Sequence, residues 1–150
     1  AVLAEIDASL AVTLRFPGDR LAQFFCSFGS GPSESIRIIG SSGELILDPA
    51  FKFDSALRLT VRTEEAEAVV PFDQVDHFSG QIAYFSDCIL TDTPPEADGE
   101  EGLADMRALL AIDEAARTGE TVRLEPRPFK AGIRGELLRA FPPTTKRLLV

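Results

Sequence analysis

The chain has 150 residues, enough for one domain with a substantial hydrophobic core. Apolar residues make up 45% and charged residues 26%, which excludes wholesale disorder. The 24 Asp and Glu outnumber the 15 Lys and Arg, and the net charge of −9 argues against a nucleic-acid partner and an anionic membrane. No apolar run approaches the roughly 20 residues that a membrane-spanning helix needs, so we expect no membrane association.

The first part of the chain alternates apolar and polar residues, which is typical of strands. This pattern predicts a strand over Ser9–Phe16, a tight turn at Pro17–Arg20 and a second strand over Leu21–Phe28. Both faces of the second strand carry aromatic side chains. We therefore expect a sheet that packs helices on one face and a different partner on the other.

Four more short strands follow at close spacing. The same alternation predicts them at Ser35–Ile39, Glu44–Leu47, Leu57–Arg62 and Glu67–Val70. The glycines of Gly40–Gly43 predict a hairpin turn between the first two of these strands. Six strands joined by short turns indicate a meandering, mostly antiparallel sheet.

The second half of the chain changes to a helical period. A helix is predicted from about Asp73 to Leu90, because apolar residues recur there at steps of three and four. These residues are Val75, Phe78, Ile82, Phe85 and Ile89. Pro94 and Pro95 then predict a loop, since adjacent prolines end helices.

A second helix is predicted over Glu101–Arg117, with Asp98 as its N-cap and Thr118-Gly119 as its C-terminal signal. We expect a short strand to follow at Thr121–Leu124. The apolar residues that we expect this helix to bury are Leu103, Met106, Leu110 and Ile112.

The chain ends differ in character from the rest. Glu125–Val150 holds four of the ten prolines and an excess of basic residues, which predicts an extended tail on a surface or a neighbouring subunit. The first residues show neither an initiator Met nor a signal peptide, so we expect a segment of a longer protein, cytoplasmic by default. Cys26 and Cys88 lie in apolar runs, which favours two buried free thiols over one disulfide.

Sequence motifs for catalysis are mostly missing. There is no GxGxxG, GxxxxGK[ST] or GxSxG, and His77 is the single histidine. Without a Cys/His cluster we expect no metal site. The adjacent acidic pairs of the chain do not face each other across a cleft, and we interpret them as solvated charges.

The segment around His77 is the one candidate cluster. On a helix, Asp76, His77, Gln81 and Tyr84 lie beside the apolar stripe, where they are able to bind hydroxyl groups as one wall of a substrate cleft. The alternative is that His77 and Tyr84 are half-exposed residues with ordinary hydrogen bonds, and the residues alone favour it. A hydrolase that uses His77 is a third, weaker hypothesis.

Five blocks in one order resemble the C-terminal domain of the glucose–fructose oxidoreductase, inositol dehydrogenase and MocA-type oxidoreductases. They span about residues 7–124 and are carried by four strings, the last of which holds two blocks: DASLAVTLRFPGDRLAQFFCSF, IRIIGSSGELILDPAF, DHFSGQIAYFSDCIL and DGEEGLADMRALLAIDEAARTGETVRL. The resemblance implies an α+β fold, an open and mostly antiparallel sheet with two main helices on one face. The other face of the sheet is then the subunit interface of a dimer or tetramer, with Leu21, Gln23 and Phe25 as candidate interface residues.

The resemblance also implies an activity for the whole protein. Such enzymes transfer hydride between NAD or NADP and a sugar, polyol or related compound, and an N-terminal Rossmann domain binds the cofactor. The glycine-rich fingerprint, the Glu-Lys-Pro lysine and the Asp/His or Tyr-bearing substrate motif of the family do not occur in this sequence. No catalytic or cofactor-binding residue is therefore carried over, and Asp76, His77, Gln81 and Tyr84 are cleft candidates by position.

We therefore interpret residues 1–124 as the sheet domain of a nicotinamide-dependent sugar or polyol oxidoreductase and residues 125–150 as an extension. Its expected partners are its own Rossmann domain, a second copy and a small sugar-like substrate. By itself the chain is expected to bind no cofactor and to be inactive. The alternative is a stand-alone dimerisation or ligand-binding module with the same fold.

Overall fold

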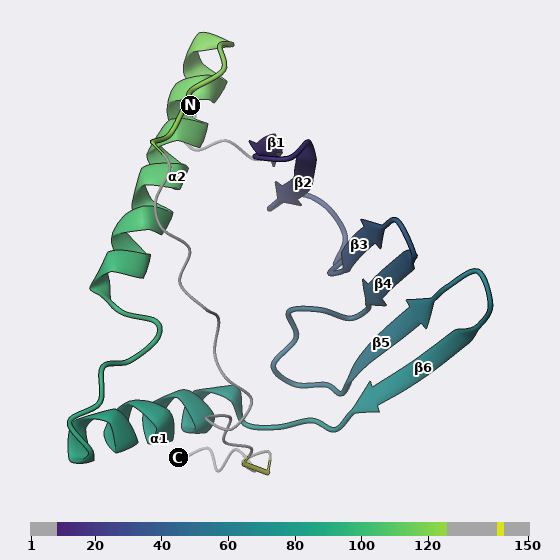
Figure 1. The fold of residues 1–150 in the computed structure, drawn as a ribbon, viewed down its shortest axis with the longest axis vertical. Coiled ribbons are helices and arrows are strands. Elements are labelled where there is room, and N and C mark those ends of the chain that lie inside the picture. Colours follow the sequence, from purple (N-terminus) through teal and green to yellow (C-terminus); the bar gives the residue numbers. More distant parts are fainter. Residues whose placement is uncertain (1–8, 126–140, 143–150) are drawn as a thin grey trace. The chain divides into compact units, whose positions relative to one another are not determined.

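The computed structural model describes residues 9–125 and 141–142. In this part of the chain six strands are followed by two helices (Figure 1), which confirms the expected α+β class with mostly antiparallel strands. The chain divides into two units, one of residues 1–33 and 108–124, the other of residues 34–107 and 125–150. The predicted extension lies almost entirely outside the described residues.

The first unit contains an antiparallel hairpin of β1 (Ser9–Phe16) and β2 (Arg20–Ser27). Its turn is the predicted one, and Gly18 and Asp19 both adopt positive φ there. Because side chains alternate along a strand, one face of β2 carries the candidate interface residues. These are Leu21, Gln23 and Phe25, and all three are exposed.

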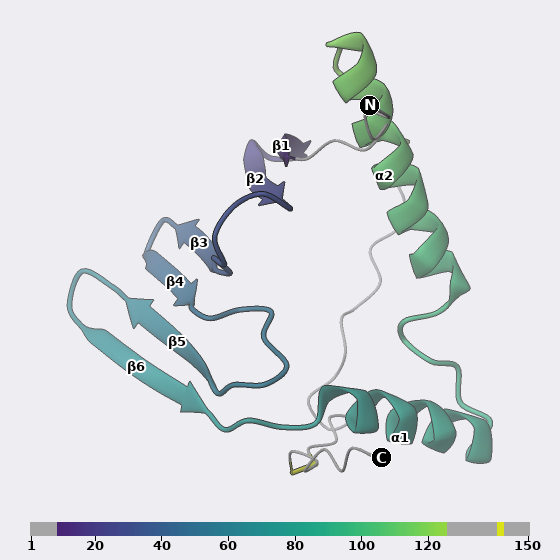
Figure 2. The ribbon, with the colours of Figure 1, turned by 180° about the vertical axis from the view of Figure 1, so that it is seen from behind.

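The second unit contains a four-stranded meander in the order β3-β4-β5-β6 (Figure 2). Its strands are β3 (Ile36–Gly40), β4 (Gly43–Leu47), β5 (Leu57–Arg62) and β6 (Glu67–Phe72). Gly40 pairs with Gly43, so the predicted hairpin turn is confirmed. The two units thus contain one antiparallel sheet each, of two strands and of four strands.

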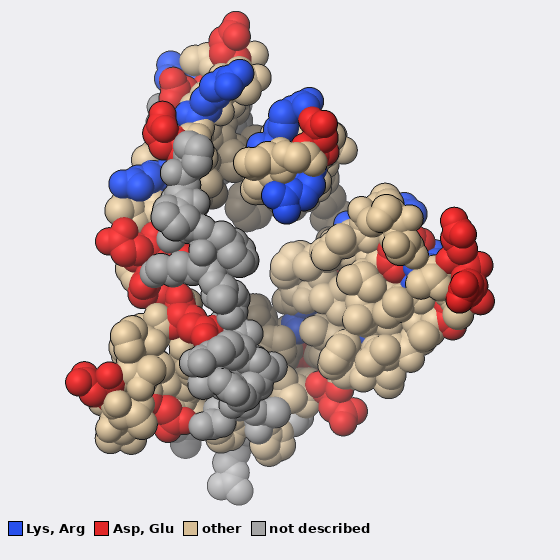
Figure 3. All heavy atoms as spheres, in the orientation of Figure 1, with Lys and Arg blue, Asp and Glu red and all other residues tan. Residues whose placement is uncertain are grey.

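The cross-strand register gives the β3–β6 sheet two unlike faces. One face, the apolar face, is formed entirely by apolar side chains: Ile36, Ile38, Leu45, Leu47, Leu57, Leu59, Val61, Ala68, Val70 and Phe72. The opposite face carries ion pairs, in which Glu44 accepts from Arg37 at 2.5 Å and from Arg62 at 3.1 Å. In Figure 3 the visible surface of this sheet is mostly uncharged, and acidic side chains gather at the β5–β6 turn.

Helix α1 (His77–Leu90) starts four residues later than the apolar period predicts. Asp76 has extended backbone angles, and its carboxylate accepts the N–H of Ser79 at 2.9 Å, so it caps the helix. Strand β6 also runs on to Phe72, which leaves a short connection before the cap. The apolar stripe of α1 is exposed in the structure, so its packing on the sheet stays a prediction.

Helix α2 (Gly99–Thr118) has the predicted cap. The Asp98 carboxylate accepts the N–H groups of Glu100 and Glu101, both at 3.0 Å, and Gly119 ends the helix with a φ of +74°. Two expectations are wrong: residues 121–124 form no strand, and three of the four apolar side chains expected to be buried are exposed. They are Leu103, Met106 and Leu110.

Burial in the described residues is slight. Cys88, at 7% exposure, is the one apolar residue among them that is buried, whereas Cys26 is exposed, contrary to expectation. Both cysteines are free thiols. None of the helices in the described part of the chain is long and apolar enough to cross a membrane.

Candidate functional site

The start of α1 brings two of the candidate residues together. Asp76 uses its carboxylate to cap the helix, and its backbone N–H donates to the carbonyl of Phe141 at 2.9 Å. A residue far along the sequence is thus bonded to the helix start. His77 follows as the first helical residue, and its imidazole is half-buried.

One aromatic ring, that of Phe53, contacts His77. Phe53, in the loop between β4 and β5, meets the imidazole edge to face, with the two ring centres 5.5 Å apart and the planes at 83°. The same phenyl ring lies 5.2 Å from the ring of Phe78 at 39°. Phe53 is a residue that the sequence reasoning missed. Its one signal is the pair of phenylalanines, Phe51 and Phe53, in a connection where polar turn residues are usual.

The other two candidates lie farther along α1. Gln81 is exposed one turn after His77, and Tyr84 is half-buried a further turn on. The Tyr84 hydroxyl accepts the backbone N–H of Glu96 at 2.9 Å, in the connection to α2. Asp76 thus binds a backbone N–H in the first turn of the helix, and Tyr84 binds one in the connection after the helix. His77 and Gln81 lie between these two residues along the chain.

The surroundings of Tyr84 favour its protonated form. The N–H of Glu96 lowers the pKa of the phenol, but desolvation and the hydrogen-bonded Cys88 thiol outweigh this effect. The net pKa lies above its ordinary value. Tyr84 in this form binds the backbone of the α1–α2 connection through its hydroxyl.

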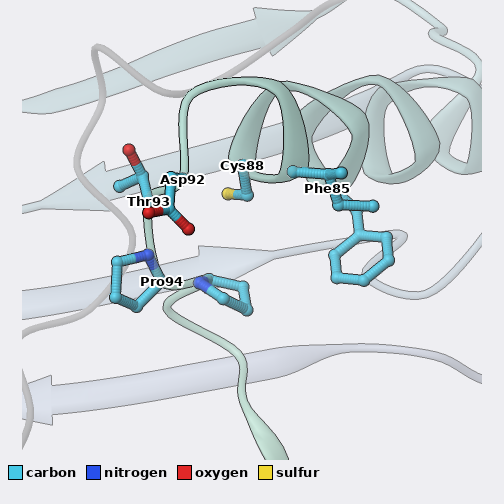
Figure 4. A pocket seen from close by; sticks show the side chains of 7 residues that line it. Phe85, Cys88, Asp92, Thr93 and Pro94 are labelled. Atoms are coloured by element: carbon cyan, nitrogen blue, oxygen red, sulfur yellow. The ribbon is translucent and has the colours of Figure 1, made fainter.

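A pocket of about 290 Å³ lies at the C-terminal end of α1. In Figure 4 the Cys88 sulfur points toward the loop of Thr93 and Pro94, and Phe85 closes another side. The lining is mainly apolar and includes no histidine. We find no set of groups in this pocket that would carry out chemistry.

The described residues do not fit a nicotinamide dinucleotide. Such a cofactor is typically held where a parallel strand leads through a glycine-rich turn into a helix, with the phosphates at the helix N-terminus. Here every strand pair of the described chain is antiparallel, and α2 starts with Glu100 and Glu101, whose charges repel phosphate. Nor do these residues contain a group of three or more His, Cys, Asp or Glu that could hold a metal ion.

Comparison with known proteins adds what the geometry does not show. The chain is 37% identical over 117 residues to a D-xylose 1-dehydrogenase [NADP(+)] of Haloarcula marismortui, an alignment that covers 77% of this chain and 32% of that protein. The chain is similar to sugar oxidoreductases. A second D-xylose 1-dehydrogenase (NADP(+)), from Haloferax volcanii, is 29% identical over 122 residues, covering 80% of this chain and 38% of its own length.

A third relative has a different activity in its name. The 1,5-anhydro-D-fructose reductase of Ensifer adhaerens is 28% identical over 113 residues, which cover 75% of this chain and 34% of that protein. The chain spans about a third of the length of these relatives. No protein-family model matches the chain, and no solved structure matches it.

Proposed function

We propose that this chain is the substrate-side domain of an NADP-dependent sugar dehydrogenase in the glucose–fructose oxidoreductase, inositol dehydrogenase and MocA-type family. The observation that carries the proposal is the 37% identity to an NADP-dependent D-xylose dehydrogenase over 77% of the chain. The reaction class is the oxidation of a sugar hydroxyl, with a nicotinamide cofactor as hydride acceptor. NADP is favoured over NAD because two of the relatives are named for it.

The substrate class is a small cyclic sugar. The relatives are named for D-xylose and 1,5-anhydro-D-fructose, which both form six-membered rings of five carbons and one oxygen that bear several hydroxyl groups. At the start of α1, Asp76, His77 and Gln81 supply groups that exchange hydrogen bonds with hydroxyls. We assign these side chains to substrate binding and Tyr84 to the support of the helix.

In this proposal a Rossmann domain binds the cofactor, and that domain is not part of these 150 residues. Two facts support this division: the chain spans about a third of its relatives, and its described residues are antiparallel where a dinucleotide site needs a parallel unit. We further propose that the chain self-associates through the β2 face with Leu21, Gln23 and Phe25, because that face exposes large apolar side chains.

The test is the activity of the complete gene product. Purified full-length protein is incubated with NADP⁺ and a panel of pentoses and hexoses, and the formation of NADPH is followed by absorbance. We expect turnover with at least one aldose, D-xylose first, and none from the 150-residue chain alone. Lack of turnover with every sugar, in protein that binds NADPH, would contradict the proposal.

A further inference from the structure

Phe53 is both exposed to solvent and in contact with neighbouring aromatic rings. Phe53 is 61% exposed, yet it takes part in both aromatic ring contacts of the described residues, one with His77 and one with Phe78. The two contacts place the ring beside His77, a candidate substrate residue. The remaining surface of the ring stays open to solvent.

We propose that Phe53 is a substrate-contacting residue whose open ring face stacks against the apolar C–H face of the sugar, beside the imidazole of His77. The inference rests on the proposed function and adds a specificity residue to it. It places the sugar-binding surface between the β4–β5 loop and the start of α1. Nothing in the sequence pattern connects these two segments.

The chemistry of a cyclic sugar matches this surface. Its C–H groups form apolar patches that carry a small positive charge, and its hydroxyls project from the rim of the ring. An aromatic face is negative at its centre, so it attracts such C–H groups while it shields them from water. His77 lies at the edge of the aromatic ring, where its imidazole forms a hydrogen bond with a hydroxyl of the sugar.

The neighbouring phenylalanine of the same loop shows why position matters. Phe51 is as exposed as Phe53, at 62%, but no ring contact is recorded for it in the described part of the chain. A ring that is already held loses less conformational entropy when a ligand binds. Phe51 is therefore the matched control, because it has the same chemistry and exposure in the same loop.

The first experiment measures steady-state kinetics of the full-length protein with its best sugar and NADP⁺. We expect Phe53→Leu to raise the KM for the sugar roughly five- to tenfold. This factor corresponds to the free energy that an aromatic contact contributes in addition to the burial of apolar area. The KM for NADP⁺ should stay unchanged. Phe53→Tyr, which keeps the ring, should restore the sugar KM, and Phe51→Leu should leave it unaltered.

A second measurement applies even if Phe53→Leu fails to fold. The chain has no tryptophan, so Phe53→Trp and Phe51→Trp introduce probes whose fluorescence is compared with that of the unaltered protein. We expect the sugar to change the emission of Phe53→Trp alone. An equal response in both variants, or in neither, would overturn the inference.

The kinetic outcomes separate the two proposals. An unaltered sugar KM in folded Phe53→Leu overturns the role of Phe53, while the sugar dehydrogenase activity stands. Absence of sugar turnover in the unaltered protein overturns the proposed function and removes the inference with it. A lower melting temperature with an unchanged sugar KM shows that Phe53 only fastens the loop, which also overturns the proposal.

Discussion

At the scale of single residues, Gly43 shows how tightly one position of the sheet is packed. It opens β4 with a φ of +147°, a region that residues with a side chain rarely adopt. A Cβ built there would lie 2.1 Å from the backbone oxygen of Arg62 in β5. The turn was predicted from its glycines, but the approach of β5 was not, because it depends on a strand far along the chain.

We expect Gly43→Ala to destabilise the protein by about 2 kcal/mol or more, since the strained backbone and the steric overlap add. The measurement is the free energy of unfolding in denaturant. Gly40→Ala is the control at the other end of the same turn, because its Cβ would meet no atom closer than 3.7 Å. Equal losses in the two variants would show that the approach to Arg62 is not what requires glycine.

The candidate site shows the same division between local and distant information. His77 was singled out because it is the one histidine of the sequence and begins an amphipathic segment. Phe53 was not, since an aromatic residue in a loop acquires a role only from the residue that it meets. The contact joins positions 24 apart in the sequence, 53 and 77, and no periodic pattern records it.

At the scale of elements, a ladder of ion pairs crosses all four strands of the β3–β6 sheet. Glu44 in β4 bonds Arg37 in β3 and Arg62 in β5, and Arg62 also donates to Glu67 in β6 at 2.5 Å. The hydrogen bond from Arg37 and then that from Arg62 lower the pKa of Glu44 below its ordinary value. These ion pairs therefore favour the observed cross-strand register on this face of the sheet.

This lowered pKa predicts a dependence of stability on pH. The stabilisation by Glu44 is fully present above its unfolded-state pKa of about 4.3 and is lost as the pH falls through the lower folded-state value. We expect Glu44→Gln to lower the melting temperature at neutral pH. Below about pH 4 the melting temperature of the variant should fall less steeply than that of the unaltered protein. Glu64→Gln, on the exposed β5–β6 turn, is the control and should leave both unchanged.

At the scale of the whole molecule, the exposed apolar surface is the main feature. The β3–β6 sheet has an apolar face of ten side chains, and both helices expose their apolar stripes in the part of the chain that the structure describes. A surface of this kind is usually covered by another domain or subunit. This agrees with the proposal that the chain works within a larger protein that self-associates.

The solution mass of the full-length protein, measured by light scattering, tests self-association. We expect a dimer or a larger assembly that Phe25→Asp dissociates, because a carboxylate would be buried in an apolar interface. Phe28→Asp is the control, since Phe28 is more exposed than Phe25 but follows the end of β2. A monomeric unaltered protein would contradict the proposed interface.

Residue patterns along the chain were enough to predict the six strands of the described residues, the two turns with glycine and the caps at Asp98 and Gly119. These features depend on residue periods and on contacts within a few positions, which are visible along the chain. Contacts between distant residues decided the hydrogen bond of Asp76 to Phe141 and the meeting of Phe53 with His77. Each of these depends on which distant groups satisfy a hydrogen bond or cover a ring, and such pairings follow from packing in three dimensions.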